Sequence, residues 1–195
     1  YKRKAKIIAV TGSSGKTTTK NMIISVLKQK YTVCGTHENQ NNEIGVPLTL
    51  LQLTRAHGIA ILDMGASHPW DIKELVEIAE PTCGLITNVG RAHLQGFGSF
   101  EGVMSTKAEL YDYLRQHGGF IFRNTDNPYL AQMAGELQTM AYTTGAMPEQ
   151  SHLVGAYNAE NVSAAICVGT HFGIPYQQAL EAVCAYEPSN KRSQL

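Results

Sequence analysis

The sequence lacks the features typical of nucleic-acid-binding and membrane proteins. Its 16 Lys and Arg residues balance 16 Asp and Glu residues, so the formal net charge is +0. A neutral chain has no overall positive field for nucleic acid or for an anionic membrane surface. No uninterrupted apolar run approaches the ~20 residues that a membrane-spanning helix needs. We therefore expect no nucleic acid partner and no membrane insertion, and any anion site must be local.

Cysteine is also scarce. The four cysteines are far apart and form no C-x-x-C pair; they are Cys34, Cys83, Cys167 and Cys184. This spacing suggests neither a zinc site nor a disulfide framework, so a reducing cytoplasm is the expected location. The chain opens on Tyr1 without a signal-peptide pattern and closes without an obvious end signal, which predicts a piece of a longer protein.

What is present is enough hydrophobic sequence for one domain, 43% of 195 residues. Apolar stretches typical of buried strands alternate with segments of helical periodicity. The strand-like stretches are 7–10, 59–64, 84–89 and 119–123, and the helical ones are 15–29, 69–79, 101–116, 158–172 and 176–185. This order predicts the α/β class, a mostly parallel sheet flanked by helices on both faces. The polar, aperiodic region 140–152 is expected to be a loop or a junction.

The most informative feature is a glycine-rich run directly behind the first strand-like stretch. Its residues are Thr11, Gly12, Ser13, Ser14, Gly15, Lys16, Thr17 and Thr18. Strand, glycine loop and helix start in this order direct backbone N–H groups at one point, which suits a polyphosphate. Lys16 adds a mobile charge for the β- and γ-phosphates, and the Thr17 hydroxyl can bind the accompanying Mg²⁺.

The match to the strict P-loop pattern is incomplete, because Val10 stands where that pattern has its first glycine. The run is therefore a shortened T-G-x-x-G-K-T form. The alternative is a turn whose glycines merely adopt positive φ, with Lys16 a solvated residue at a helix start. The strand before the run and the helix after it favour nucleotide binding.

Asp63 ends the apolar stretch that begins at residue 59. Because ligands of open α/β sheets sit at the carboxyl edge of the strands, this carboxylate is placed to hold Mg²⁺ directly or through water. The alternative is that it caps the turn at 65–67. His93 follows the stretch 84–89 at the same edge, where it is either a metal ligand or an ordinary surface histidine.

Lys107 is unusual because it shares one helix face with Val103, Leu110 and Leu114. Its long side chain either reaches past the apolar face to solvent or is buried. Burial would lower the pKa of the amine and leave a neutral group able to react with CO₂ to form a carbamate. The sequence leaves both possibilities open.

Taken together, four features resemble the Mur ligases of bacterial peptidoglycan synthesis. They are the run 11–17, the N-x-N-N-x-x-G-x-P segment 39–47, the N-V-G-R-A-H-L segment 88–94, and Lys107. The asparagine-rich segment favours the D-alanyl-D-alanine-adding members, and its alternative is a polar loop that caps a helix. The resemblance implies a central, P-loop-containing ATP-binding domain over 1–195, trimmed near 140–152, without the family's N-terminal uridine-nucleotide domain and C-terminal domain.

The resemblance also implies roles for individual residues. Those implied in catalysis are Lys16, His93 and Lys107, the last of them as a carbamate. Those implied around Mg²⁺ are Thr17, Asp63, His93 and Lys107, although the family usually has glutamate where this chain has Asp63. Those implied to bind ATP are Gly12 to Thr18, Asn158, Asn161 and Arg192. Those implied to face the substrate are Asn39, Asn41 and Asn42.

The implied reaction is ATP-dependent addition of D-Ala-D-Ala to UDP-N-acetylmuramoyl-tripeptide through an acyl phosphate, by a monomeric enzyme of which this piece alone is inactive. Other functions remain open at this point. They are a related Mur or folylpolyglutamate synthase-like ligase, a P-loop regulatory ATPase or GTPase, and a nucleotide-binding module without ligase activity. The asparagine-rich segment argues against the first, and the missing N-K-x-D motif argues against GTP.

Overall fold

The computed structural model describes residues 4–38, 40–90, 94–153, 155 and 157–188. Within these ranges six parallel strands form one sheet in the order β2-β3-β1-β4-β5-β6. The strands are β1 (Lys6–Thr11), β2 (Val33–Gly35), β3 (Ile59–Asp63), β4 (Cys83–Ile86), β5 (Phe120–Asn124) and β6 (Thr139–Tyr142). The predicted α/β class is confirmed.

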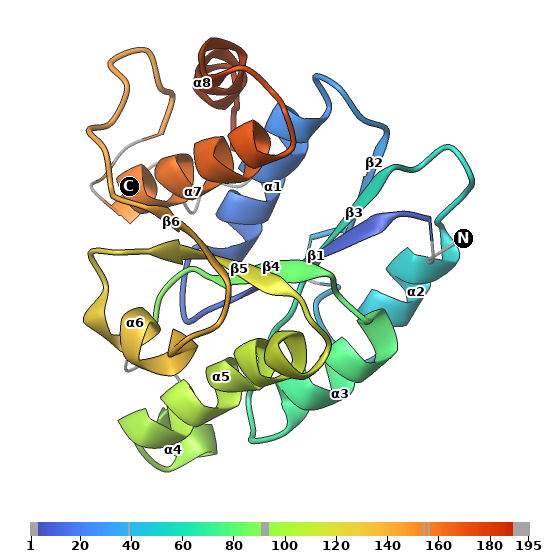
Figure 1. Cartoon of the computed structure of the whole chain (residues 1–195), viewed down its shortest axis with the longest axis vertical. Coiled ribbons are helices and arrows are strands. Elements are labelled where there is room, and N and C mark those ends of the chain that lie inside the picture. The colour runs from blue at the N-terminus through green and yellow to red at the C-terminus, as the bar shows by residue number, and fades with distance from the viewer. Residues whose placement is uncertain (1–3, 39, 91–93, 154, 156, 189–195) are drawn as a thin grey trace.

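Helices cover both faces of the sheet (Figure 1). One layer holds α1 (Lys16–Leu27), α7 (Tyr157–His171) and α8 (Tyr176–Cys184). The other holds α2 (Gly45–Leu51), α3 (Asp71–Ala79), α4 (Leu94–Phe97), α5 (Phe100–Gln116) and α6 (Pro128–Ala134). Successive residues of β1 point to opposite layers, so Ile7 and Ala9 join one apolar core while Ile8 and Val10 join the other. No helix in the described ranges is long and apolar enough to cross a bilayer.

The central strand β1 lies between β3 and β4, and the chain crosses from β3 past β1 to reach β4. The direction in which strands are added to the sheet therefore changes beside β1. Val10 is paired with Asp63, and Thr11 with Ile86, so the three strands end at nearly the same level. A crevice at the carboxyl edge beside such a change in strand order is where α/β proteins bind their ligands.

Two predicted boundaries are wrong. The stretch 84–89 was expected to be all strand, but β4 ends at Ile86 because the following residues turn toward the glycine-rich loop, where Asn88 O accepts the Ser13 N–H at 3.0 Å. The region 140–152 was expected to be a loop, but its first residues belong to β6 and pair with β5. β6 is a half-exposed edge strand without the alternation that marks a strand in the sequence.

Candidate functional site

The glycine-rich loop leaves the carboxyl end of β1 and leads directly into α1. Gly12 has a φ of +143° and Gly15 a φ of +78°, both in the region that favours glycine. A Cβ on Gly12 would overlap Thr87 Oγ1, and one on Gly15 would lie 2.7 Å from Asn161 Oδ1. The two glycines are therefore needed for space as well as for φ, since the loop is packed between the exit of β4 and helix α7.

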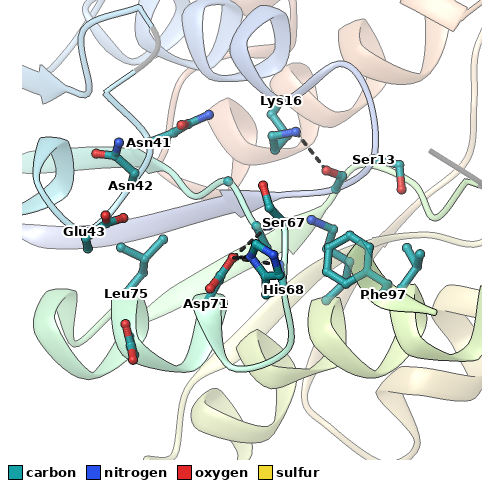
Figure 2. Close-up of a pocket in the computed structure, with 16 residues that line it drawn as sticks. Ser13, Lys16, Asn41, Asn42, Glu43, Ser67, His68, Asp71, Leu75 and Phe97 are labelled. Carbon is teal, nitrogen blue, oxygen red and sulfur yellow. Dashed lines mark hydrogen bonds and ion pairs between the residues drawn. The ribbon is translucent and has the colours of Figure 1, made fainter. Parts of the chain in front are cut away.

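The N-terminus of α1 faces the site without a side-chain cap. The first N–H groups of a helix lack helical acceptors and carry partial positive charge, so they suit an anion. Lys16 Nζ donates to Gly12 O at 2.9 Å and thus bends back over the loop that precedes it (Figure 2). Thr18 is half-buried in the first turn. The loop has the geometry of a phosphate site.

Asp63 lies beside the first turn of α1. The Thr17 hydroxyl donates to Asp63 Oδ2 at 2.9 Å, while Asp63 Oδ1 is buried and has no hydrogen-bond partner in the part of the chain that the structure describes. A buried carboxylate oxygen without a partner, next to a hydroxyl, is an oxygen ligand pair of the kind that Mg²⁺ prefers. These residues fit a hard divalent cation.

The turn at 65–67 is not capped by Asp63. Its N–H groups at Ser67 and His68 donate instead to Asp71 Oδ2, at 2.8 and 2.9 Å. The capping alternative for Asp63 is therefore wrong. Within the described ranges no three His, Cys, Asp or Glu side chains cluster to hold a metal by themselves. An ion beside Asp63 would need further oxygen ligands, such as those of a phosphate.

A buried lysine that the sequence analysis missed lies next to this carboxylate. Lys20 is fully buried on α1, its ammonium donates to Thr36 O, and Thr36 Oγ1 accepts the Asp63 N–H at 2.9 Å. Burial raises the pKa of Asp63, and the charge of Lys16, the Thr17 hydrogen bond and the charge of Lys20 oppose that shift. The signal was present, because Lys20 has helical spacing with the apolar residues of α1.

Lys107 does not reach past its helix to solvent. Its side chain is only 3% exposed, and its amine lies 5.8 Å from the centroid of the Phe97 ring. Burial, and then the nearby charge of Lys16, lower the pKa of Lys107 to about 8, although Asp63 opposes the shift. The buried alternative from the sequence is confirmed, and burial favours the neutral form of the amine.

Lys16 and Lys107 border one cleft of about 640 Å³, shown in Figure 2. Its lining residues are Gly12, Ser13, Lys16, Asn41, Asn42, Glu43, Gly65, Ala66, Ser67, His68, Asp71, Glu74, Leu75, Phe97, Val103 and Lys107. We call the part lined by Gly12, Ser13, Lys16, Phe97 and Lys107 the phosphate end. We call the part lined by Asn41, Asn42, Glu43 and Glu74 the outer end.

At Asn42 the helix-capping alternative is confirmed, and contact with a substrate stays a prediction. This residue and Asn41 line the outer end of the cleft, as expected for residues that face a substrate. Asn42 Oδ1 also accepts the N–H groups of Ile44 and Gly45, at 3.2 and 2.9 Å, and so caps α2.

The remaining predicted residues fall into two groups. Asn39, His93 and Arg192 lie outside the described residues. Asn158 and Asn161 are buried on α7, where Asn161 Nδ2 donates to Asn158 Oδ1 at 3.3 Å and Asn161 Oδ1 accepts the Thr19 hydroxyl at 2.9 Å. Asn161 thus contacts the loop at Gly15 and α1 at Thr19, and the contact of either asparagine with adenine stays a prediction.

The sequence that forms this cleft matches a known protein family. The family model described as the Mur ligase middle domain matches residues 10–146, more than half of the chain. The chain belongs to this family. The match to the Mur ligase middle domain contains the glycine-rich loop, Asp63 and Lys107.

Individual relatives are similar over about two thirds of the chain or more. The UDP-N-acetylmuramoyl-tripeptide–D-alanyl-D-alanine ligase of Bacillus subtilis (strain 168) is 36% identical over 214 residues, which cover 97% of this chain and 46% of that protein. The enzyme of the same name from Escherichia coli (strain K12) is 40% identical over 126 residues, covering 65% of this chain and 28% of that protein. The chain thus spans less than half the length of these curated Mur ligases.

Solved Mur ligase structures have the same fold. A crystal structure of MurF from Acinetobacter baumannii has a TM-score of 0.86 and 27% identity, covering 97% of this chain and 48% of that one. MurF from Thermotoga maritima, crystallised in complex with ADP, has a TM-score of 0.81 and 28% identity, covering 96% and 50% of the two chains. The fold of the middle domain is therefore that of MurF.

Proposed function

We propose that this chain is the ATP-binding domain of a ligase that adds D-Ala-D-Ala to UDP-N-acetylmuramoyl-tripeptide. The observation that carries the proposal is that Lys16 and Lys107 line one end of one cleft, while Asp63, bonded to Thr17, lies close enough for its charge to act on both lysines. A phosphate loop with its lysine and oxygen ligands for a cation are the parts that recur in enzymes of phosphoryl transfer. The relatives named above carry this activity, which supports the choice of substrates.

The proposed reaction has two steps. A carboxylate oxygen of the tripeptide attacks the γ-phosphorus of ATP, ADP leaves, and an acyl phosphate forms. The amine nitrogen of D-Ala-D-Ala then attacks the acyl carbon, phosphate leaves with the electron pair of the broken C–O bond, and the amine loses a proton. Lys16 and the first N–H groups of α1 offset the negative charge on the transferred phosphoryl group and hold it in place.

The residues that would hold Mg²⁺ are Thr17 and Asp63, together with phosphate oxygens of the nucleotide. When bound, the ion neutralises phosphate charge and orients the γ-phosphoryl group. Thr17 and Asp63 are held in place before any ligand arrives, because their hydrogen bond joins α1 to the end of β3. His93 belongs to the same proposal through the family resemblance.

Lys107 is proposed to act as a carbamate. Its neutral amine attacks CO₂, an N–C bond forms, and one proton leaves, so that a neutral group becomes an anion. A low pKa favours this step because only the neutral amine is nucleophilic. The carbamate would place negative charge beside the phosphate end, where it can orient a second cation.

The location and assembly state belong to the same proposal. Cys34, Cys83, Cys167 and Cys184 are all free thiols in the structure, which agrees with a reducing cytoplasm. We propose that the protein acts there as a monomer. Both points are open to direct measurement by fractionation and by light scattering of the whole protein.

Calorimetry of this domain with Mg·ADP tests the nucleotide site. Lys16→Ala is expected to abolish binding, because it removes the ammonium that faces the phosphates. Lys28→Ala is the matched control, since Lys28 follows the end of α1 and is exposed. Equal binding by Lys16→Ala and the parent would reject the phosphate loop.

Phosphate release by the whole protein tests the reaction. We expect release from ATP only when both D-Ala-D-Ala and the UDP-linked tripeptide are present. Release with a different amine in place of D-Ala-D-Ala would assign the chain to another ligase of the family.

A further inference from the structure

The segment that follows β4 is hydrogen-bonded to the glycine-rich loop through groups that the proposed reaction does not use. Asn88 makes most of these contacts. Its Oδ1 accepts both the N–H of Ser14, at 3.1 Å, and the Ser14 hydroxyl, at 3.2 Å, while its Nδ2 donates to Ser14 O at 3.2 Å. Its backbone O accepts the Ser13 N–H at 3.0 Å. One asparagine thus satisfies three polar groups of Ser14 and one of Ser13.

Residues next to Asn88 make further hydrogen bonds to the loop. The Thr87 hydroxyl donates to Ser14 O at 2.6 Å, and the Gly90 N–H donates to Ser13 Oγ at 2.9 Å. Gly12 packs so closely on Thr87 that a Cβ would not fit between them. The outer half of the loop is therefore shaped by residues about 75 positions later in the chain, since these bonds join residues 73 to 77 apart.

These bonds determine which N–H groups of the loop remain for a ligand. The N–H groups of Ser13 and Ser14 already have protein acceptors. The groups at the start of α1, which begins at Lys16, lack helical acceptors and can face a phosphate. Ser14 therefore serves the loop as an anchor in this structure, and it is held by Asn88.

We propose that Asn88 is a positioning residue for the nucleotide site, whose side-chain amide fixes Ser14 and so sets the loop in the shape that receives the phosphates. This inference rests on the proposed function, because it assumes that a nucleotide binds at the loop. Asn88 acts through Ser14 and touches no reacting atom. It is suited to the task because an amide both donates and accepts, and Ser14 presents two donors and one acceptor.

The test is calorimetry of Mg·ADP binding to the domain carrying Asn88→Ala, with the thermal unfolding midpoint measured in parallel. We expect a dissociation constant about tenfold higher, as the loss of one or two hydrogen bonds implies. The matched control is Asn127→Ala. Asn127 Oδ1 accepts the N–H groups of Tyr129 and Leu130, at 3.1 and 3.3 Å, and caps α6 away from the cleft.

The control separates positioning from general loss of stability. Asn127→Ala is expected to lower the unfolding midpoint while leaving the dissociation constant within about twofold of the parent, because its bonds do not touch the loop. If Asn88→Ala folds and binds Mg·ADP as tightly as the parent, the inference is overturned. If its affinity falls only as far as that of Asn127→Ala, the loss is structural and the inference is again overturned.

A second variant uses charge. Asn88→Asp keeps the acceptor for Ser14 but loses the donor and adds a negative charge beside the phosphates. Its dissociation constant is expected to exceed that of Asn88→Ala, and the excess should shrink as salt is raised. A loss that is no larger than that of alanine and is independent of salt would show that Asn88 is not close to the phosphates.

Failure of the inference is distinguishable from failure of the proposed function. If the parent domain binds Mg·ADP and Lys16→Ala does not, the nucleotide site stands whatever Asn88→Ala does. If the parent does not bind, the proposed function fails, and the inference fails with it.

Discussion

The two ends of the cleft are built in different ways. At the phosphate end, Lys107 is buried, and nearby Asp63 is buried at the end of β3 and bonded to the first turn of α1. At the outer end, Glu43 and Glu74 are exposed, and Asn42 is occupied in capping a short helix. The comparison teaches that the sheet edge presets the phosphate end, whereas the outer end consists of short loops and helix starts that can change without disturbing the sheet.

The difference predicts where substitutions act. Changes at the phosphate end should alter nucleotide or cation binding strongly, because buried groups are poorly screened and closely packed. Changes at the outer end should leave the nucleotide alone and affect whatever binds beside it. Each prediction below tests that division, and they run from the largest expected effect to the smallest.

Gly15→Ala should be the most damaging single change at the phosphate end. Its φ of +78° costs about 1–2 kcal/mol for a residue with a Cβ, and that Cβ would lie 2.7 Å from Asn161 Oδ1. We expect Mg·ADP affinity to fall about 100-fold, the effect of displacing a binding group by about 1 Å. Calorimetry and chemical denaturation measure the two effects.

The matched control for this change is Gly118→Ala. Gly118 has a similar φ of +68°, but open space surrounds the position where its Cβ would lie. It should show the conformational cost alone and leave nucleotide affinity unchanged. If the two variants behaved alike, the packing of the loop against α7 would have no role in binding.

Asp63→Asn should weaken the binding of the cation but not the binding of the metal-free nucleotide. The amide keeps the shape of the side chain and an acceptor for Thr17 but loses the charge. We expect the Mg²⁺-dependent part of ADP affinity to fall at least about tenfold, the scale of a disturbed metal site. Binding in excess chelator should be unchanged. A variant with full Mg²⁺ dependence would contradict the assignment of Asp63.

Lys107 should form a CO₂ adduct that depends on pH. Since burial lowers its pKa to about 8, its neutral fraction grows about tenfold between pH 7 and pH 9. At fixed dissolved CO₂, the adduct seen by ¹³C NMR should grow with pH, because the reaction consumes the neutral amine and releases a proton. Lys107→Met should lose it.

Lys20 provides the control for this adduct. It is buried and its pKa is also lowered by burial, but its ammonium already donates to Thr36 O. Lys20→Met should therefore keep the adduct. A signal that disappears with Lys20, or that is absent from the parent at every pH, would count against the carbamate.

Glu74→Gln should have the smallest effect on the nucleotide. Glu74 is exposed at the outer end, where solvent and salt screen its charge. We expect the Mg·ADP dissociation constant to stay within about twofold of the parent. A loss beyond about tenfold would mean that the two ends of the cleft act as one unit.

Much of this could be predicted from sequence because the decisive signals are local. Buried parallel strands read as apolar runs, so β1, β3, β4 and β5 were found, and the glycine run marked the loop. The missed elements β2, α4 and α6 have only three to seven residues, too few to show a period. β6 was missed because an edge strand lacks a clear apolar pattern.

The sequence did not predict which side chains far apart in the chain would contact one another. Asn88 was visible only as part of a motif, and nothing local indicated that its amide would reach Ser14. The same holds for Asn161, which was assigned to adenine by resemblance but contacts Gly15 and Thr19 in the structure. Such contacts depend on how the crossovers stack, and a single sequence does not encode that stacking as a periodic pattern.

The bond between Thr19 and Asn161 joins residues 142 apart. During synthesis the glycine loop leaves the ribosome long before α7 is made. The Thr19–Asn161 bond that holds the loop against α7 can therefore form only after α7 has been synthesised. Nucleotide affinity should therefore arise late and abruptly as the chain lengthens. A ribosome-bound fragment that ends before α7 should not bind ADP, even though it contains the entire glycine run.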